Sequence, residues 1–244
     1  YVDQPHLSNV PSLRLFATHV PYLSLPTSIQ TSKCQIVYVC RNPLDTFISL
    51  WHFYLQFDRN KGIVPSMKLM EDYADKYFNE IIPYGPLEDH LLGYWKESMK
   101  NPGKVLFFEY EGLKKEPIAN LKRLANYVGF PFSDEEENAN VIDHILELCS
   151  LRSLKEREVN KSGRVYPSFE NKVLFRKGET GDWANYLIPA MAKRIDAMRQ
   201  KLNKDSFSFK YYGTNLMFHS KNVYEDMINS CQLALFVTFF FCLK

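Results

Sequence analysis

The stretch QIVYVCRNPLDTFIS, residues 35–49, decides the fold because it joins a buried strand to a helix. Its first part is almost entirely apolar and rich in β-branched side chains, which predicts a strand buried on both faces. Arg41 ends that run, and Pro43 fits the first turn of a following helix. Asn42 can cap this helix, and Asp45 favours its positive end. The sequence therefore predicts a strand that ends in a cation at the start of a helix.

The same alternation of strands and helices continues on both sides of this stretch. Apolar runs at 13–17 and 104–109 predict two further strands. Helical periodicity and suitable caps predict helices over 43–57, 66–79, 86–98, 117–128, 134–148 and 189–202. The stretch 155–185 has weak periodicity, so we expect a long loop there. This order predicts an α/β fold, a single domain whose central parallel sheet is flanked by helices, with the strand that ends at Cys40 near its centre.

The bulk composition argues against several classes of protein. The 244 residues are 45% hydrophobic and 24% charged, which is ordinary for a globular protein, and a formal net charge of +2 argues against a nucleic-acid binder. The five cysteines form no CxxC pair and no ligand spacing with histidine. We therefore expect no metal site, reduced thiols and a cytoplasmic location. Residues 1–10 lack the basic start and apolar run of a signal peptide.

The C-terminal tail differs in character from the rest of the chain. Residues 233–243, LALFVTFFFCL, are almost all apolar. This run falls well short of the roughly 20 residues that span a bilayer, so a membrane anchor is disfavoured and no membrane partner is expected. A buried strand and an error in the gene model are the two interpretations that stay open.

A histidine follows the first predicted strand. In RLFATHVPY, residues 14–22, His19 takes the position where α/β enzymes place their chemistry, at the carboxyl end of a strand. Imidazole titrates near neutral pH and can take a proton from an alcohol or a phenol. A histidine that is merely hydrogen-bonded at the start of a loop would give the same pattern, so His19 alone decides no function.

The helix that follows Arg41 carries a polar stripe. A guanidinium is a planar fork that suits a phosphate group. Asp45, Ser49 and His52 recur at helical spacing on one side of this helix, while the residues between them are largely apolar. The pattern fits a polar site beside Arg41, and it fits a solvated helix face equally well.

A second cationic segment is FRKGETGDW, residues 175–183. Arg176 and Lys177 stand beside Gly178, and glycines let a backbone approach an anion closely. Residues 152–177 hold eight Lys or Arg against three acids, a local balance of +5. This segment is a candidate anion site, and an ordinary solvated loop is the alternative.

Taken together and in this order, these segments resemble the cytosolic, PAPS-dependent sulfotransferases. Their amino-acid sequences are most similar to those of the plant enzymes. The resemblance rests on RLFATHVPY, IVYVCRNPLDTFISLWHF, GYWKESMKNPGKVLFFEYEGLKKEPI, EVNKSG and FRKGETGDW. It covers residues 1–212 as one sulfotransferase domain and leaves 213–244 as an atypical apolar tail. It implies transfer of a sulfuryl group from PAPS to a hydroxyl of a small molecule, of phenolic, flavonoid or steroid-like class. No metal takes part, and a homodimer is compatible with it.

The resemblance also implies roles for individual residues. His19 matches the catalytic base, and Tyr110 matches a tyrosine near the adenine. The resemblance assigns binding of the 3′-phosphate of PAPS to Arg41, Ser49, Arg176, Lys177 and Gly178. Leu151 stands where the family often has a phenylalanine beside the adenine, so one stacking contact is expected to be lost.

One family segment has no counterpart in these residues. Sulfotransferases carry a segment like PKSGTTW upstream of the histidine motif, and its loop amides cradle the 5′-phosphosulfate. We therefore expect a truncated fold that lacks its first strand and phosphate loop, and a chain that is inactive as written. The apolar run 233–243 could cover part of the surface so exposed. The alternative function is a non-catalytic remnant that binds nucleotide weakly or associates with related subunits, while a P-loop kinase is disfavoured because no GxxxxGK[ST] occurs.

Overall fold

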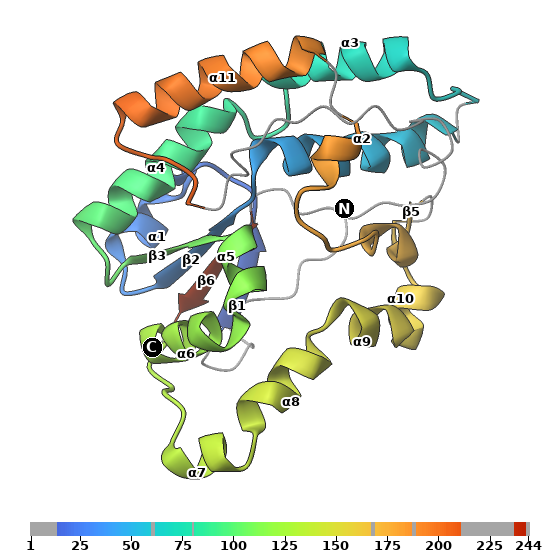
Figure 1. Cartoon of the computed structure of the whole chain (residues 1–244). Coiled ribbons are helices and arrows are strands. Elements are labelled where there is room, and N and C mark those ends of the chain that lie inside the picture. The colour runs from blue at the N-terminus through green and yellow to red at the C-terminus, as the bar shows by residue number, and fades with distance from the viewer. Residues whose placement is uncertain are drawn as a thin grey trace.

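The predicted α/β architecture is confirmed in the computed structural model, which describes residues 14–59, 62–79, 81–166, 169–186, 189–210 and 237–242. A four-stranded sheet has the order β1-β6-β2-β3 (Figure 1). The strands are β1 (Arg14–Thr18), β2 (Gln35–Cys40), β3 (Val105–Glu109) and β6 (Val237–Cys242). β2 and β3 are parallel, as the sequence predicts, and β2 is an interior strand.

Helices cover both faces of the sheet because β2 and β3 are apolar on both faces. The first face packs Ile36, Tyr38 and Cys40 against one large core, and the second packs Val37 against Leu106 in a smaller core. α2, α3, α4 and α11 lie over the first face, and α5 and α6 lie over the second (Figure 1). These helices are α2 (Pro43–Arg59), α3 (Met67–Phe78), α4 (Leu87–Lys100), α5 (Tyr110–Lys115), α6 (Pro117–Tyr127) and α11 (Pro189–Lys204).

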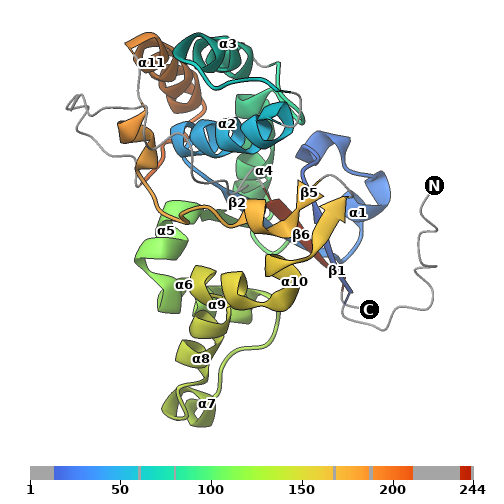
Figure 2. The same cartoon turned by 90° about the vertical axis from the view of Figure 1, so that its right-hand side faces the viewer.

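The predicted helix over 134–148 is two helices. α7 (Asp134–Asn138) begins with a capping box at Ser133, and α8 (Val141–Leu148) follows after a break. Asn140 makes the break, since its φ is 56° and asparagine tolerates the left-handed region better than most residues. Both helices lie away from the sheet in the two views (Figure 2).

The expected long loop over 155–185 is a series of short elements. They are α9 (Leu151–Glu156), α10 (Glu158–Lys161), β4 (Arg164–Tyr166), β5 (Phe169–Glu170), η3 (Asn171–Leu174) and η4 (Asp182–Asn185). Hydrophobic periodicity does not reveal these helices and strands because each is too short to show a repeat. Polar contacts hold them instead. The Ser150 side chain caps α9, and the Asn171 side chain donates to the Val159 carbonyl.

The tail contributes a strand to the centre of the sheet. β6 pairs antiparallel with β1 on one side and with β2 on the other, so that Phe239 stands opposite both Ala17 and Val37. The interpretation of the apolar run as a strand is confirmed for residues 237–242, and 213–236 lie outside the described residues. An antiparallel strand inside the predicted parallel sheet is a feature that the sequence pattern does not reveal. No helix among the described residues is long and apolar enough to cross a membrane.

One cysteine departs from the expectation of reduced thiols. Cys34, just before β2, is joined in a disulfide, whereas Cys40 and Cys149 are free. Sequence spacing does not show which thiols the fold brings within bonding distance.

Candidate active site

Two strands deliver the candidate residues to one edge of the sheet. β1 and β2 are each antiparallel to β6, so they run in the same direction and their carboxyl ends meet the same edge. His19 follows β1 and Arg41 follows β2. Because neighbouring strands lie about 4.8 Å apart, the width of β6 separates the two strand ends by roughly 10 Å. The structure therefore places His19 and Arg41 along one edge without bringing them into one cluster.

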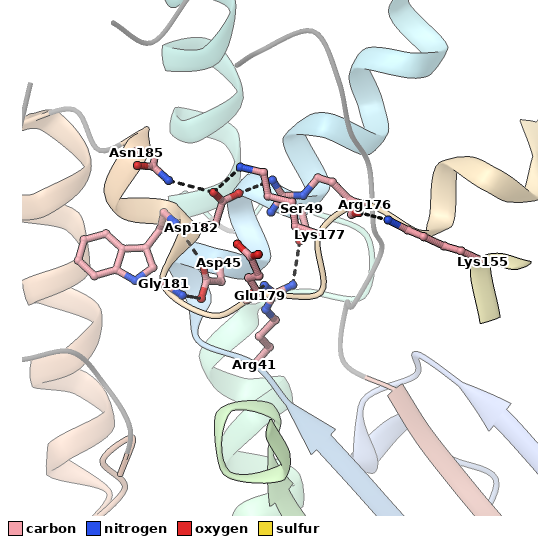
Figure 3. Close-up of polar contacts among 11 residues, drawn as sticks. Arg41, Asp45, Ser49, Lys155, Arg176, Lys177, Glu179, Gly181, Asp182 and Asn185 are labelled. Carbon is pink, nitrogen blue, oxygen red and sulfur yellow. Dashed lines mark hydrogen bonds and ion pairs between the residues drawn. The ribbon is translucent and has the colours of Figure 1, made fainter. Parts of the chain in front are cut away.

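Arg41 is buried in a cage of side chains and backbone. Its guanidinium donates to Ser49 Oγ at 3.0 Å and to the Glu179 carbonyl at 2.6 Å (Figure 3). The guanidinium also lies over the Tyr110 ring, 4.9 Å from the ring centroid. Only 3% of Arg41 and 1% of Ser49 are exposed. The solvated-face alternative for the polar stripe of α2 is therefore wrong. Three segments that are far apart in sequence meet at this one cation.

Tyr110 links the end of β3 to the segment 175–183, the glycine turn, which holds Gly178 and Gly181. Its hydroxyl donates to the Gly178 carbonyl at 3.1 Å, and burial raises its pKa, so the phenol keeps its proton. Beside it, Glu111 Oε1 accepts from the Asn42 backbone N–H at 3.0 Å. Burial also raises the pKa of Glu111. These contacts fix the junction between β2 and α2, from which Arg41 projects.

Asp45 clasps the glycine turn onto α2. Its two carboxylate oxygens accept from the backbone N–H groups of Gly181 at 2.7 Å and Trp183 at 3.1 Å (Figure 3). Gly178 and Gly181 have φ of 65° and 82°, which glycine adopts without strain. Burial raises the pKa of Asp45, and Arg41 and the two N–H donors offset part of that rise. The sequence assigns Asp45 to the helix start and gives no sign of this clasp.

The two cations of the turn share one buried acid. Arg176 forms an ion pair with Asp182, and Lys177 Nζ lies 2.9 Å from the same carboxylate. The Asp182 side chain is 1% exposed. Burial by itself would raise its pKa, but hydrogen bonds from Lys177 and Arg176 outweigh burial and hold it below its ordinary value. Lys155 donates to the Arg176 carbonyl at 2.8 Å, so a further cation borders the turn.

Two strong donors in this cluster are still unused. Within the described part of the chain, the buried Nε atoms of Arg41 and Arg176 have no hydrogen-bond partner. Buried donors of this kind are costly unless a partner arrives, and a phosphate oxygen is a suitable partner for a guanidinium. The cluster therefore has the charge and the open donors to receive an anion.

His19 occupies the other part of the edge, beside Tyr84. The two ring centroids are 5.4 Å apart and the rings are tilted by 35°. Tyr84 lies before α4 with a φ of 65°, which is uncommon for a tyrosine. No periodic or motif signal in the sequence distinguishes Tyr84. The ring contact gives the imidazole a fixed neighbour at the carboxyl end of β1.

An aromatic cavity lies between α2 and α3, and the segment 81–83 before Tyr84 lines part of it. Its volume is about 210 Å³, and its lining includes Trp51, Tyr54, Tyr73, Tyr77, Lys76 and Pro83. Pro83 precedes Tyr84 in the chain, so the segment that lines the cavity also carries the tyrosine that contacts His19. A cavity of this composition suits a flat apolar molecule with few polar groups.

The fold and the site together define an α/β domain with a buried arginine at the carboxyl edge of its sheet, beside a cationic glycine turn. The particular family follows from comparison with known proteins. A family model described as the sulfotransferase domain matches residues 2–207. The chain belongs to the sulfotransferase family.

Curated relatives in Arabidopsis thaliana agree with this assignment. The chain is 46% identical over 209 residues to cytosolic sulfotransferase 15, covering 85% of this chain and 57% of that protein. It is 41% identical over 209 residues to cytosolic sulfotransferase 5, covering 85% of this chain and 64% of that protein. The chain thus spans less than two thirds of the length of these relatives.

Solved structures show the same fold. Mouse sulfotransferase SULT7A1 in complex with PAP is 29% identical with a TM-score of 0.60, covering 75% of this chain and 63% of that chain. A putative steroid sulphotransferase of Arabidopsis thaliana is 33% identical with a TM-score of 0.58, covering 84% of this chain and 57% of that chain.

Proposed function

We propose that this chain binds PAPS, and that the protein to which it belongs transfers the sulfuryl group of PAPS to a hydroxyl of a small-molecule acceptor in the cytoplasm. The observation that carries the proposal is the cage around Arg41. A guanidinium that is 3% exposed beside Ser49, with a buried Nε left over, is arranged for an oxyanion. Membership of the sulfotransferase family supports the 3′-phosphate of PAPS as this anion.

In this proposal the 3′-phosphate lies between α2 and the glycine turn. Arg41 and Ser49 approach it from α2, and Arg176, Lys177 and Gly178 approach it from the turn. The clasp at Asp45 supports this reading, because it holds the turn against the helix before any ligand binds. Tyr110, which touches both Arg41 and Gly178, takes the place beside the adenine.

The chemical step assigned to His19 is proton removal. The acceptor oxygen forms a bond to sulfur while the bond from sulfur to the phosphate oxygen of PAPS breaks, and PAP leaves with the negative charge. The acceptor proton passes to the neutral imidazole of His19. The transferring group spreads negative charge over its oxygens, so fixed donors and cations supply most of the rate enhancement. We assign no metal to this reaction.

We place the acceptor in the aromatic cavity between α2 and α3. Its aromatic lining supports this placement, as does the position in sequence of Pro83, which lines the cavity, next to Tyr84, which contacts His19. Phenolic, flavonoid and steroid-like molecules are flat and apolar enough to fit such a lining.

We further propose that residues 1–244 by themselves give no measurable turnover. No PKSGTTW-like segment occurs among them, so they supply no loop amides for the 5′-phosphosulfate. Losing one preorganised donor of this kind typically costs about 10²–10³ in rate. The competing function is a non-catalytic chain that binds nucleotide weakly, and it is favoured by the same observation.

Calorimetric titration of the purified chain with PAP and with 5′-AMP tests the proposal. The two nucleotides differ by the 3′-phosphate, so we expect PAP to bind at least about tenfold more tightly, or about 1.4 kcal/mol. Equal affinity for the two would overturn the assignment of the Arg41 cage. A turnover assay with PAPS and a mixture of phenolic acceptors, run on the same sample, tests the expected inactivity of residues 1–244. Binding without turnover agrees with it, and turnover would show that the loop is dispensable.

A further inference from the structure

A buried histidine outside the cluster of Arg41, Arg176 and Lys177 connects β2 to the residues that follow β1. His90 lies on α4 and is 1% exposed. Its Nε2 is 2.8 Å from the backbone carbonyl of His19, and its Nδ1 is 3.0 Å from the hydroxyl of Tyr38 on β2. One imidazole thus connects the interior strand to the residue proposed as the base.

The partners of His90 determine where its proton lies. A carbonyl oxygen can only accept, so Nε2 of His90 carries the hydrogen and donates it to His19. Nδ1 is then the acceptor for the Tyr38 hydroxyl. Burial lowers the pKa of His90 and raises the pKa of Tyr38 well above its ordinary value. The neutral imidazole and the protonated phenol that this pattern requires are therefore the forms that burial favours.

A second side chain of α4 holds the next carbonyl. The Tyr94 hydroxyl donates to the Val20 carbonyl at 2.7 Å, and the Tyr94 ring stacks on Tyr38 with centroids 4.2 Å apart. His90 and Tyr94 are four residues apart, so they lie on the same face of the helix. Consecutive carbonyls after β1 are thereby fixed to a helix that packs in the core.

These contacts matter because they hold the residues that follow an edge strand. β1 is an edge strand of the sheet, and Leu15 on it is 58% exposed. In the sheet that the structure describes, β1 pairs with β6, and β6 in turn pairs with the interior strand β2. Contacts from α4 therefore tie the segment that carries His19 to the core independently of β6.

We infer that His90 is a positioning residue, which with Tyr94 holds the backbone of His19 so that its imidazole stays beside Tyr84. His90 touches backbone rather than a reacting atom, and its effect passes through His19. The inference rests on the proposed function for the importance of His19, while the contact that it explains is measurable without any nucleotide.

Two substitutions separate the hydrogen bond from simple packing. The amide nitrogen of a glutamine reaches about as far as Nε2 of histidine, so His90→Gln can still donate to the His19 carbonyl. The shorter His90→Asn matches Nδ1 and can accept from Tyr38, but it falls short of His19. We expect His90→Gln to preserve the position of His19 and His90→Asn to lose it.

NMR of the full chain with labelled aromatic side chains reads this position directly. The wild type and His90→Gln should show a nuclear Overhauser contact between the rings of His19 and Tyr84, and His90→Asn should lack it. PAP affinity should stay within about twofold in all three, because the cation cluster is untouched. A contact that persists in His90→Asn, or one that is lost equally in both variants, would overturn the positioning role.

Tyr94→Phe provides a second test if His90→Asn fails to fold. It keeps the ring stack on Tyr38 and removes only the bond to the Val20 carbonyl, so the ring contact of His19 should weaken in a folded protein. An unchanged contact would contradict the inference. A failure of the proposed function would appear differently, as equal binding of PAP and 5′-AMP with the ring contact intact.

Discussion

The two halves of the sheet edge are held in different ways. At the end of β2, Arg41 is fixed by side chains and backbone from α2, α5 and the glycine turn, in a closely packed polar network. At the end of β1, His19 depends on an edge strand that pairs with β6 and on carbonyl contacts from α4. The Arg41 half of the edge is therefore preorganised by a dense local network, whereas the His19 half depends on remote elements.

Removing residues 237–244 should have the largest effect, and it should fall on the half of the edge that carries His19. The deletion removes β6, which pairs with five residues of β1 and five of β2. Unpaired strand edges and apolar neighbours would be exposed, which promotes aggregation. We expect loss of a single cooperative thermal transition and aggregation by size-exclusion chromatography. Removing only residues 243–244, which follow β6, is the matched control. A deletion variant that melts like this control would show that β6 is dispensable.

Asp182→Ala should have the next largest effect, and on the opposite half. It leaves Arg176 buried without its counter-ion, which typically costs about 3–5 kcal/mol of stability. The matched control is Asp72→Ala, which removes an exposed ion pair with Lys68 and should cost less than about 1 kcal/mol. Thermal denaturation of both variants measures the difference. If the two variants lost equal stability, the ion pair of the turn would not be the support that we describe.

Much of the fold could be predicted because apolar periodicity and caps record burial directly. β2 and the helix after Pro43 occur where the sequence predicts them. The register of β6 could not be predicted, since an apolar run carries no information about its partner strand or its direction. Asn140 likewise has no apolar signal, so the break between α7 and α8 was missed.

The candidate site was only partly predictable. Motifs identified Arg41 and Arg176, and the structure brings their segments together. Asp45 was missed as a partner because its contacts with Gly181 and Trp183 cross 136 and 138 positions of sequence. Asp182 is close in sequence to Arg176 and Lys177, but their ion pairs depend on how the turn folds, which no repeat in the sequence shows. Tyr84, like Asp45, was missed because its contact with His19 joins distant segments. Motifs reveal the charges that a ligand would meet, whereas the groups that hold those charges in place emerge only from the fold.

The two acids that hold the turn, Asp45 on α2 and Asp182 in the turn itself, should respond to pH with opposite signs. Asp45 has a raised pKa, so the folded state takes up its proton first, and its contribution to stability grows as pH falls toward the unfolded pKa near 3.8. Asp182 has a lowered pKa, so its contribution is present above the unfolded value and is lost as pH falls through the folded one.

Denaturant unfolding of the wild type, Asp45→Asn and Asp182→Asn between about pH 3 and 6 measures these contributions. The stability difference between wild type and Asp45→Asn should shift in favour of the wild type as pH falls. The difference between wild type and Asp182→Asn should shift against the wild type at the acid end. Two differences with the same sign of slope would contradict the described environments.

The affinities for PAP of the wild type, Arg41→Ala and His19→Ala test whether Arg41 binds the 3′-phosphate while His19 takes no part in binding. Arg41→Ala removes charge-assisted hydrogen bonds worth about 1.5–3 kcal/mol, so PAP should bind roughly 10- to 100-fold more weakly. His19→Ala alters the other half of the edge and should leave the affinity within about twofold. Equal affinity for PAP in the wild type and Arg41→Ala would contradict the account, as would equal weakening by both substitutions.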